Sequence, residues 1–249
     1  MPKQKGLVKI EGTLDDITFF KRKDVFLVRT KGGVSKERIM NDPAFLRTRE
    51  NGTEFGSVAG SGKLLRNACS VLTKSAYDGG LSNRLVQELT KVKNADTISA
   101  RGERNVSVGI TTTDGKLILK GFNFNSKAPL SSILFAPFTL ATASGKVEIT
   151  DLNPLDMLKY PPHATHVAFQ SAFLNLNFDG GAFEILYSPI TNLAINSTVG
   201  SVTLTPTGVP AGTATSFYLL LIEFFQEVNG AQYALNNGNY NVLSLLDIV

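Results

Sequence analysis

The two histidines of the chain, His163 and His166, are the side chains best suited to proton transfer or metal binding near neutral pH. A metal site would need further ligands, and the flanking sequence supplies neither a cysteine nor a cluster of carboxylates. A Ser–His–Asp triad is assembled in space, so a hydrolase stays open as an alternative, although no nucleophile-elbow motif is present. We therefore predict that both histidines are turn and strand-start residues.

A glycine-rich segment from Gly56 to Lys63 invites comparison with a phosphate-binding loop. Counting back from Gly62-Lys63, the first glycine of that motif is replaced by Ser57. The residue after the lysine is Leu64, where the motif has a serine or threonine for magnesium. The segment is predicted to be a flexible turn that enters a helix. Its backbone N–H groups could still hold an anion at the helix start.

Other reactive side chains are few. Glu148, Asp151 and Asp156 lie close in sequence, where paired carboxylates could do acid–base chemistry, but solvated loop charges explain them better. Cys69, the single cysteine, lies in an apolar helical run and is predicted to be a small core residue. One cysteine cannot form an internal disulfide, so the sequence does not fix the redox compartment. We predict no catalytic residue, no cofactor and no metal, and thus no enzyme.

Charge is divided unevenly along the 249 residues, whose net charge is +4. Residues 1–120 contain 22 Lys and Arg against 13 Asp and Glu, whereas residues 121–249 contain 3 against 8. The first part therefore has a balance of +9 and the second a balance of −5. Such opposite charges would steer the positive part of one copy to the negative part of another, or bring the positive part to a polyanion.

Nine basic residues are candidates for contacts with another subunit or with a polyanion. No recognised nucleic-acid-binding motif accompanies them, and acidic residues such as Glu50, Glu54 and Glu103 are interleaved with them. Contacts between subunits are therefore favoured over contacts with nucleic acid. The candidates are Lys21, Arg22, Lys23, Arg47, Arg49, Lys63, Arg66, Arg101 and Arg104.

The elements that would position these residues differ along the chain. Residues 6–30 are predicted to form a three-stranded β-meander, because apolar runs at 7–10, 17–20 and 25–28 are separated by charged turns. Three helices are then predicted: one from Asp42, as the N-cap before Pro43, to residue 50, and two over 63–74 and 81–92. Gly79-Gly80 predicts a turn between the last two. None is apolar enough to stand alone.

Beyond residue 105 the pattern predicts β-strands. Asp114-Gly115 is a hairpin signal between 106–113 and 116–124, and Asp179-Gly180-Gly181 and Asn229-Gly230 predict two further hairpins. Short apolar runs separated by turn residues are typical of an immunoglobulin-like or jelly-roll sandwich. We predict an α+β fold in which an N-terminal β-meander and short helices, residues 1–105, pack against a C-terminal antiparallel β-sandwich, residues 106–249. Other strands are expected at 133–140, 146–150, 165–172, 173–178, 182–187, 201–205, 215–228, 232–235 and 240–248.

Short motifs distributed over most of the chain carry a resemblance to a known family. They are Lys5-Gly6-Leu7, Lys31-Gly32-Gly33-Val34, Asn41-Asp42-Pro43-Ala44-Phe45, Arg47-Thr48-Arg49-Glu50-Asn51-Gly52, Glu54-Phe55-Gly56, Gly62-Lys63-Leu64-Leu65-Arg66 and Glu223-Phe224-Phe225-Gln226-Glu227-Val228-Asn229-Gly230. In these motifs the chain is similar to a family of uncharacterised bacterial proteins with no assigned activity. The resemblance implies one continuous unit, and it transfers no site residue and no cofactor.

No targeting segment is recognised in the sequence. The basic N-terminus is followed by Glu11, Asp15 and Asp16 in place of the apolar segment of a secretory signal. The longest apolar run, residues 217–222, is far too short to span a bilayer. We expect synthesis in the cytoplasm, with assembly there or release by another route.

The sequence favours a structural protein, a subunit that assembles with copies of itself into a filament, tube or shell. This prediction depends on the lack of catalytic motifs, the opposite charges of the two parts and the β-rich body. Two alternatives stay open. One is a surface β-sandwich that binds carbohydrate or protein; the other is a nucleic-acid-associated protein that uses its basic N-terminal half. No small-molecule substrate is indicated.

Overall fold

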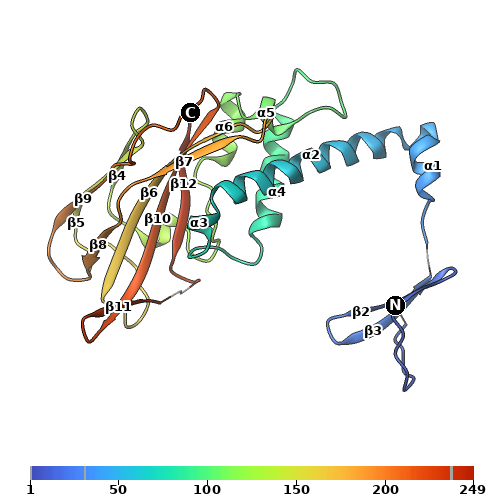
Figure 1. Ribbon diagram of the computed structural model, residues 1–249, viewed down its shortest axis with the longest axis horizontal. Coiled ribbons are helices and arrows are strands. Elements are labelled where there is room, and N and C mark those ends of the chain that lie inside the picture. Colours follow the sequence, from blue (N-terminus) through green and yellow to red (C-terminus); the bar gives the residue numbers. More distant parts are fainter. Residues whose placement is uncertain (1, 31, 236–237) are drawn as a thin grey trace. The chain divides into compact units, whose positions relative to one another are not determined.

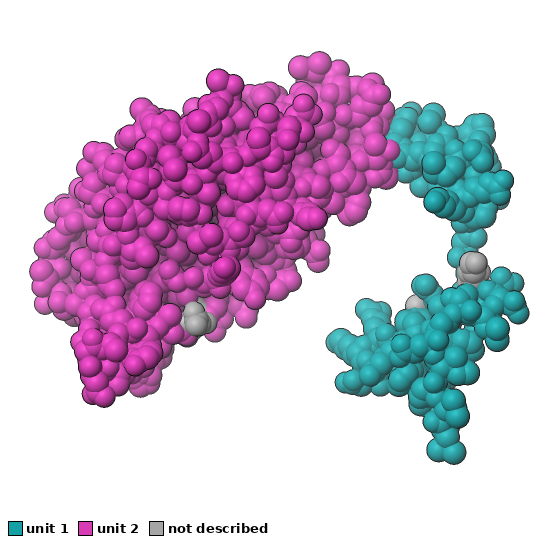
Figure 2. All heavy atoms as spheres, viewed as in Figure 1, with its two compact units in different colours: residues 1–50 teal, residues 51–249 magenta. Residues whose placement is uncertain are grey.

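Helices and antiparallel sheets both occur in the structure, which confirms the predicted mixed α+β class (Figure 1). The computed structural model describes residues 2–30, 32–235 and 238–249. The chain divides into two compact units, residues 1–50 and residues 51–249 (Figure 2). This division differs from the predicted boundary after residue 105, because the helices that follow residue 50 share a core with the later strands.

The N-terminal unit contains the predicted three-stranded meander. Strands β1 (Gly12–Leu14), β2 (Ile17–Arg22) and β3 (Val25–Thr30) pair antiparallel in that order. The position of the first strand was predicted wrongly, since residues 7–10 lie outside it. The preceding segment instead follows β3: the Gln4 N–H donates to the carbonyl of Phe26 at 3.0 Å, and the Val28 N–H donates to that of Pro2 at 2.9 Å.

Two short helical segments complete this unit and lead into a long helix. Helix α1 (Lys36–Asn41) is capped by Ser35, whose hydroxyl accepts from the Arg38 N–H at 3.2 Å. Asp42 caps the 3-10 helix Pro43–Phe45, accepting from the Ala44 N–H at 2.9 Å. The predicted N-cap is therefore confirmed, with proline at the first helical position as its missing N–H allows.

Helix α2 (Leu46–Ala68) is a single helix of 23 residues, so the prediction of two short runs separated by a glycine-rich turn is wrong. The glycines lie within the helix, and the expected anion site at a helix start falls away with the turn. Gly62 is buried, and a Cβ there would lie 3.4 Å from a methyl group of Leu89 and 3.5 Å from one of Val86. A small residue at this point lets α2 and α4 (Leu81–Asn94) pack closely.

Helix α4 confirms the predicted amphipathic pattern. Leu81, Leu85, Leu89 and Val92 are buried along one face, at helical spacing. The turn before it contains Gly79-Gly80, as predicted. Asp78 accepts from the Gly80 N–H there at 2.7 Å. Short helix α3 (Ser70–Thr73) lies between α2 and this turn.

The predicted hairpin at Asp114-Gly115 is wrong, because two short helices, α5 (Val106–Gly109) and α6 (Thr113–Leu119), occupy this part of the chain. Polar caps start both: Asn105 accepts from the Val108 N–H at 2.9 Å and Thr112 accepts from the Gly115 N–H at 3.0 Å. Gly115 is needed for close approach and has no hairpin role, since a Cβ there would overlap the carbonyl of Gly109.

The largest sheet is built on two long antiparallel strands, β6 (His166–Leu176) and β10 (Thr215–Val228). The sequence predicted two strands where β6 is one, while the extent of β10 was predicted correctly. Each long strand pairs along its outer edge with two shorter strands, one after the other. Strands β7 (Phe183–Tyr187) and β8 (Thr191–Ala194) pair with β6, and β11 (Ala231–Ala234) and β12 (Val242–Ile248) pair with β10.

Two of the predicted hairpins are confirmed. The turn at Asp179-Gly180-Gly181 joins β6 to β7, and Gly181 has a φ of 71°. The turn at Asn229-Gly230 joins β10 to β11, where Asn229 and Gly230 have φ values of 52° and 78°. Positive φ at both positions is the conformation that two-residue hairpins of this kind require.

A second sheet of three strands, β4 (Phe138–Ala141), β5 (Lys146–Leu152) and β9 (Gly200–Leu204), covers one face of the large sheet. Helix α7 (Leu130–Ile133) precedes it, and the strand predicted at 133–140 begins only at Phe138, as β4. The other face of the large sheet is covered by the helices of residues 51–120. Residues 51–249 thus form three layers, with the six-stranded sheet in the middle. The finer prediction of an immunoglobulin-like or jelly-roll sandwich is not confirmed by this arrangement.

Gly109 offers a test of the helix packing. A Cβ at Gly109 would overlap the backbone carbonyl of Val92, which has no flexible end to move aside. Gly109→Ala should therefore lower the free energy of unfolding by about 1–3 kcal/mol, as overpacking does. The matched control is Gly60→Ala, where a Cβ meets nothing within 4 Å and helix propensity predicts a gain of about 0.5–1 kcal/mol. Urea titration followed by circular dichroism measures both, and equal effects would contradict the packing.

Candidate assembly interface

Strand alternation gives the N-terminal meander two faces of different character. Side chains of directly paired residues share a face, and the register pairs Thr18 with Arg29, Phe20 with Leu27 and Arg22 with Val25. One face therefore combines two arginines with large apolar side chains. We call this the cationic face; it consists of Phe20, Arg22, Val25, Leu27 and Arg29.

Cations and aromatic rings lie together on both faces of this sheet. The Arg29 guanidinium carbon lies 5.4 Å from the ring centre of Phe20, and the Lys21 ammonium lies 5.5 Å from that of Phe26. Both distances are within the range of a cation–π interaction. Lys23, at the tip between β2 and β3, has a φ of 55°. The predicted contact residues Lys21, Arg22 and Lys23 thus gather at one end of the meander.

Burial is absent from the described part of the N-terminal unit. Among residues 2–30 and 32–50, no side chain is buried. Val25 is 38% exposed and Leu14 is 67% exposed, although both are strand residues. The meander therefore has the apolar content of a core-forming sheet, while its described side chains remain at least partly exposed.

The arginines at the start of α2 are engaged within the N-terminal unit. Arg47 forms an ion pair with Glu50 at 2.9 Å. Arg49 donates to the carbonyls of Ile39 at 2.7 Å and Asp42 at 3.0 Å, which fixes α1 against α2. These two predicted contact residues therefore have local structural roles.

The basic residues later in α2 differ from each other. Arg66 donates to the carbonyl of Gly62 at 3.2 Å and also contacts the Ser82 hydroxyl, so it links α2 to α4. Lys63 is exposed, and its side chain makes no hydrogen bond or ion pair within the described ranges. Arg101 lies in the loop between α4 and α5 and is exposed. These three residues of the second unit thus lie on different elements, Lys63 and Arg66 on α2 and Arg101 on a loop.

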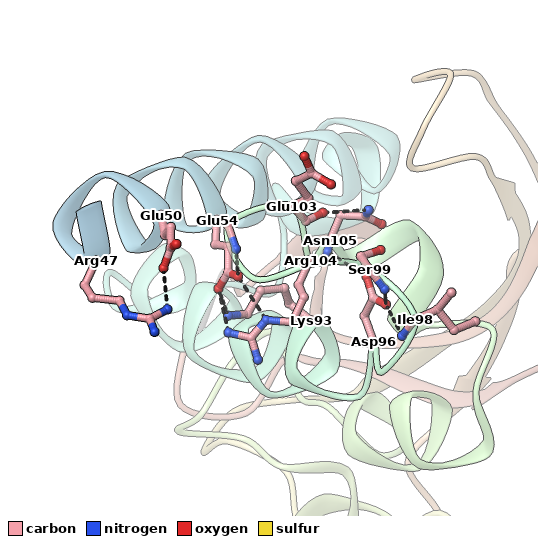
Figure 3. A network of polar contacts seen from close by, with 11 residues as sticks. Arg47, Glu50, Glu54, Lys93, Asp96, Ile98, Ser99, Glu103, Arg104 and Asn105 are labelled. Carbon is pink, nitrogen blue, oxygen red and sulfur yellow. Dashed lines mark hydrogen bonds and ion pairs between the residues drawn. The ribbon is translucent and has the colours of Figure 1, made fainter. Parts of the chain in front are cut away.

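Arg104 belongs to a buried ion cluster (Figure 3). The Glu54 side chain of α2 is 3% exposed and receives two hydrogen bonds of 2.9 Å from the Arg104 guanidinium. Lys93 of α4 pairs with the same carboxylate, and the Gly102 N–H donates to it at 2.8 Å. The Arg104 hydrogen bonds, helped by Lys93 and Gly102, hold the pKa of Glu54 down at about 2. Sequence reasoning treated Glu54 as an interleaved surface acid and missed this cluster.

The same loop is held by a second carboxylate. Asp96 is buried and accepts from the N–H groups of Ile98 at 3.1 Å, Ser99 at 2.9 Å and Asn105 at 3.1 Å. Glu54 and Asp96 therefore fix both ends of the segment between α4 and α5. The arrangement is that of a structural clamp.

A hollow of about 1070 Å³ lies beside this loop. About half of its lining residues are polar, and several of these side chains hold the surrounding loops. Asn175 donates to the Ala214 carbonyl at 2.9 Å, and Asn177 accepts from the N–H groups of Asp179 at 2.9 Å and Gly180 at 3.0 Å. Glu184 accepts from the Ala211 N–H. These contacts give several polar side chains of the lining a structural role.

The histidines occupy the positions that the sequence predicted. His163 is exposed in a turn with a φ of 69°, and His166 begins β6. Nδ1 of His166 lies 3.0 Å from the Thr165 hydroxyl, and its Nε2 lies 3.5 Å from the Glu227 carboxylate. Across residues 2–30, 32–235 and 238–249, no three His, Cys, Asp or Glu side chains come together as metal ligands.

The remaining reactive residues are each engaged separately. Glu148 pairs with Lys146 at 3.0 Å along β5, and Asp156 accepts from the Asn153 amide at 2.6 Å. Asp151, with a φ of 53°, lies where the β5–β9 register shifts. Cys69 is buried as predicted, and burial raises the pKa of its thiol to about 12. No helix of the described chain combines the length and the apolar character needed to cross a bilayer.

The far end of the large sheet carries acidic residues. Along β10, Phe217, Leu219 and Leu221 pack on the helices, and the next residues on this face are Glu223, Phe225 and Glu227. Glu223 and Phe225 are half-buried and Glu227 is exposed. We call this region the acidic sheet end; it consists of His166, Glu223, Phe225, Glu227 and Gln232. From the sequence, residues 223–230 are only a motif of the family resemblance, with no contact role predicted.

Removal of the Glu54 carboxylate tests the buried cluster. Glu54→Ala leaves Lys93 and Arg104 without their shared partner, so the free energy of unfolding should fall by about 3–5 kcal/mol. Glu88→Ala is the matched control, because Glu88 pairs with Lys91 on the surface and should change stability by less than about 1 kcal/mol. Chemical denaturation of both variants gives the comparison. Equal, small losses of unfolding free energy in both variants would contradict the structural role of Glu54.

Acid should weaken the same cluster. Because the pKa of Glu54 is lowered to about 2 from 4.5, the unfolded chain binds the proton first as pH falls. The stabilisation is therefore complete above about pH 5 and is lost as pH falls towards 2. Denaturation curves between pH 2 and 6 should show a steeper loss for the wild type than for Glu54→Gln. Parallel pH profiles would contradict the assignment.

Comparisons with known proteins were made against family models, curated proteins and solved structures. No family model, no curated protein and no solved structure matches this chain.

Proposed function

We propose that the protein is a structural subunit that assembles with copies of itself. The observation that carries this proposal is the N-terminal unit, in which no described residue is buried although β2 and β3 are rich in large apolar side chains. Small sheets need a hydrophobic face packed against a partner for stability. A unit of 50 residues lacks the size to bury enough surface alone. Another protein surface would supply the missing burial.

Charge supports a second copy as that surface. Residues 1–50 contain 12 Lys and Arg against 7 Asp and Glu, and residues 121–249 contain 3 against 8. Opposite balances in separate parts of one chain favour contacts between unlike surfaces of neighbouring copies. Unlike surfaces give head-to-tail contacts, which form rings or open polymers. The proposed products are a filament, a tube or a shell.

A nucleic-acid-associated function is a second candidate, favoured by one observation. The meander places arginine and lysine over phenylalanine rings, and single-stranded nucleic acid binds to surfaces that combine cations with aromatic rings. Acidic residues at its turns oppose this function, because Asp15, Asp16 and Asp24 lie among the cations. Self-assembly therefore stays the preferred proposal.

A third reading proposes an immunoglobulin-like or jelly-roll body that binds carbohydrate or protein through its loops. The packing of β4, β5 and β9 over the large sheet supports a two-sheet body. Several polar side chains of the large hollow, including Asn175 and Asn177, are occupied with loop contacts, which gives this alternative less support. No small-molecule substrate and no cofactor is part of any of these proposals. Synthesis in the cytoplasm is likewise proposed.

Assembly can be tested directly on the purified full chain. Sedimentation velocity and negative-stain electron microscopy at about 50 mM and 500 mM salt should show large ordered particles at low salt and fewer at high salt. Salt screens charges over about 10 Å at 0.1 M, so contacts between opposite charges weaken. The same samples incubated with single-stranded DNA and run on native gels report the second candidate. A monomer at every salt and protein concentration would overturn the proposed assembly.

A further inference from the structure

We propose that the cationic face of the N-terminal meander of one copy docks on the acidic sheet end of a second copy. This inference rests on the proposed self-assembly and names the two surfaces that would meet. The first surface is centred on Phe20, Arg22 and Leu27 and includes the neighbouring tip residue Lys23. The second is centred on Glu223, Phe225 and Glu227.

The acidic sheet end is a place where the helix layer stops before the sheet does. Side chains of β10 alternate between its two faces, and Phe217, Leu219 and Leu221 contact the buried helix residues. The next three residues on the same face of β10 are Glu223, Phe225 and Glu227, so a phenylalanine lies between two carboxylates. The strand pairing continues to Val228, so the backbone is ordered by β11 and β6 well past the last helix contact. The sheet therefore offers a formed surface.

The carboxylates of this surface are incompletely paired. In the described part of the chain, the Glu223 side chain makes no hydrogen bond or ion pair. Among the same described residues, the Glu227 carboxylate contacts only His166, at 3.5 Å, and its side chain is 41% exposed. A half-buried carboxylate without a partner beside a phenylalanine loses hydration for no compensating contact. A cation brought by another molecule would remove that cost.

The cationic face has complementary chemistry. In the same described ranges, the side chains of Arg22 and Lys23 make no hydrogen bond or ion pair. Both are exposed; Arg22 shares a sheet face with the half-buried Phe20 and Leu27, and Lys23 follows it at the tip. Two unpaired cations with an apolar centre therefore match two carboxylates that flank a phenylalanine. Arginine in particular can bind a carboxylate through two parallel hydrogen bonds.

A protein partner fits these observations better than a polyanion does. Nucleic acid would bring a continuous row of phosphates, and Asp24 lies directly beside Lys23 at the tip. The acidic sheet end also needs an occupant, and nucleic acid cannot neutralise carboxylates. A second copy satisfies both surfaces with one contact. Because the two surfaces differ, each copy would keep one surface free for the next neighbour.

Charge reversal tests the contact in the full chain. Arg22→Glu with Lys23→Glu should raise the protein concentration for half-maximal assembly at least tenfold, since like charges would face each other. Glu223→Lys with Glu227→Lys should do the same. A chain that carries all four substitutions should return to within about threefold of the wild type, because every contact is again between opposite charges. Sedimentation velocity at low salt measures each variant.

A matched control separates the contact from net charge. Lys63→Glu with Lys74→Glu makes the same change in charge as the meander variant, at two exposed residues elsewhere in the chain. This control should assemble like the wild type. If it loses assembly as strongly as Arg22→Glu with Lys23→Glu, overall charge governs association and the proposed pairing is wrong. Circular dichroism of each variant identifies any that fail to fold.

Disulfide cross-linking gives a second, independent readout. Cys69 is buried with no exposed surface, so new surface cysteines should react without interference. One variant carries Lys23→Cys, and a second carries Glu227→Cys together with a tag that makes it larger. The two are mixed and oxidised. A mixed dimer on a non-reducing gel is expected, and it shows contact between copies. Replacing Lys23→Cys by Lys63→Cys should abolish that band.

The outcomes distinguish the inference from the proposed function. A wild type that never assembles overturns the proposed function and this inference together. Assembly that survives both charge reversals, with no mixed disulfide, overturns the inference alone. If Arg22→Glu with Lys23→Glu leaves assembly intact but abolishes salt-dependent DNA binding on native gels, the cationic face serves a polyanion and the inference is wrong.

Discussion

The antiparallel pairing of β6 with β10 is the contact on which the rest of residues 51–249 depends. The register runs from Thr215–Leu176 to Phe225–His166, and every other strand of the large sheet pairs with one of these two. Both faces are covered, by helices on one side and by β4, β5 and β9 on the other. A strand covered on both faces has apolar side chains at consecutive positions, as residues 217–222 do. Burial of each large apolar side chain there stabilises the fold by about 1.5–3 kcal/mol.

The Glu54 cluster has a different role, because it fixes the loop between α4 and α5 against α2. Its carboxylate joins α2, α4 and the loop before α5 through three separate donors. A buried ion cluster of this kind adds little net stability compared with apolar packing, but each member makes the others costly to remove. Asp96 adds backbone contacts in the same loop. The loop is therefore set by directional hydrogen bonds where the apolar contacts of the helices run out.

In the N-terminal unit and the acidic sheet end, by contrast, charged and apolar side chains lack full partners within the described chain. Each is locally well formed by strand pairing, and each leaves apolar and charged side chains incompletely satisfied. Self-assembly would explain both with one interaction, whereas the buried cluster needs no partner. Of the nine basic residues chosen from the sequence, the structure thus separates those with internal roles, such as Arg49 and Arg104, from the exposed group at the meander tip.

The sequence by itself determined the elements whose signals are local. The Asp42 cap, the face of α4, the turns at Gly181 and Gly230, and the full extent of β10 all follow from neighbours along the chain. Only the tertiary structure decided the elements that close packing governs. Glycines that suggested a loop lie inside α2, and Gly115 lies in a helix, because a missing side chain permits close approach as well as a turn. Likewise, whether Glu54, Arg104 or Glu223 is paired depends on residues far away in sequence, which spacing cannot reveal.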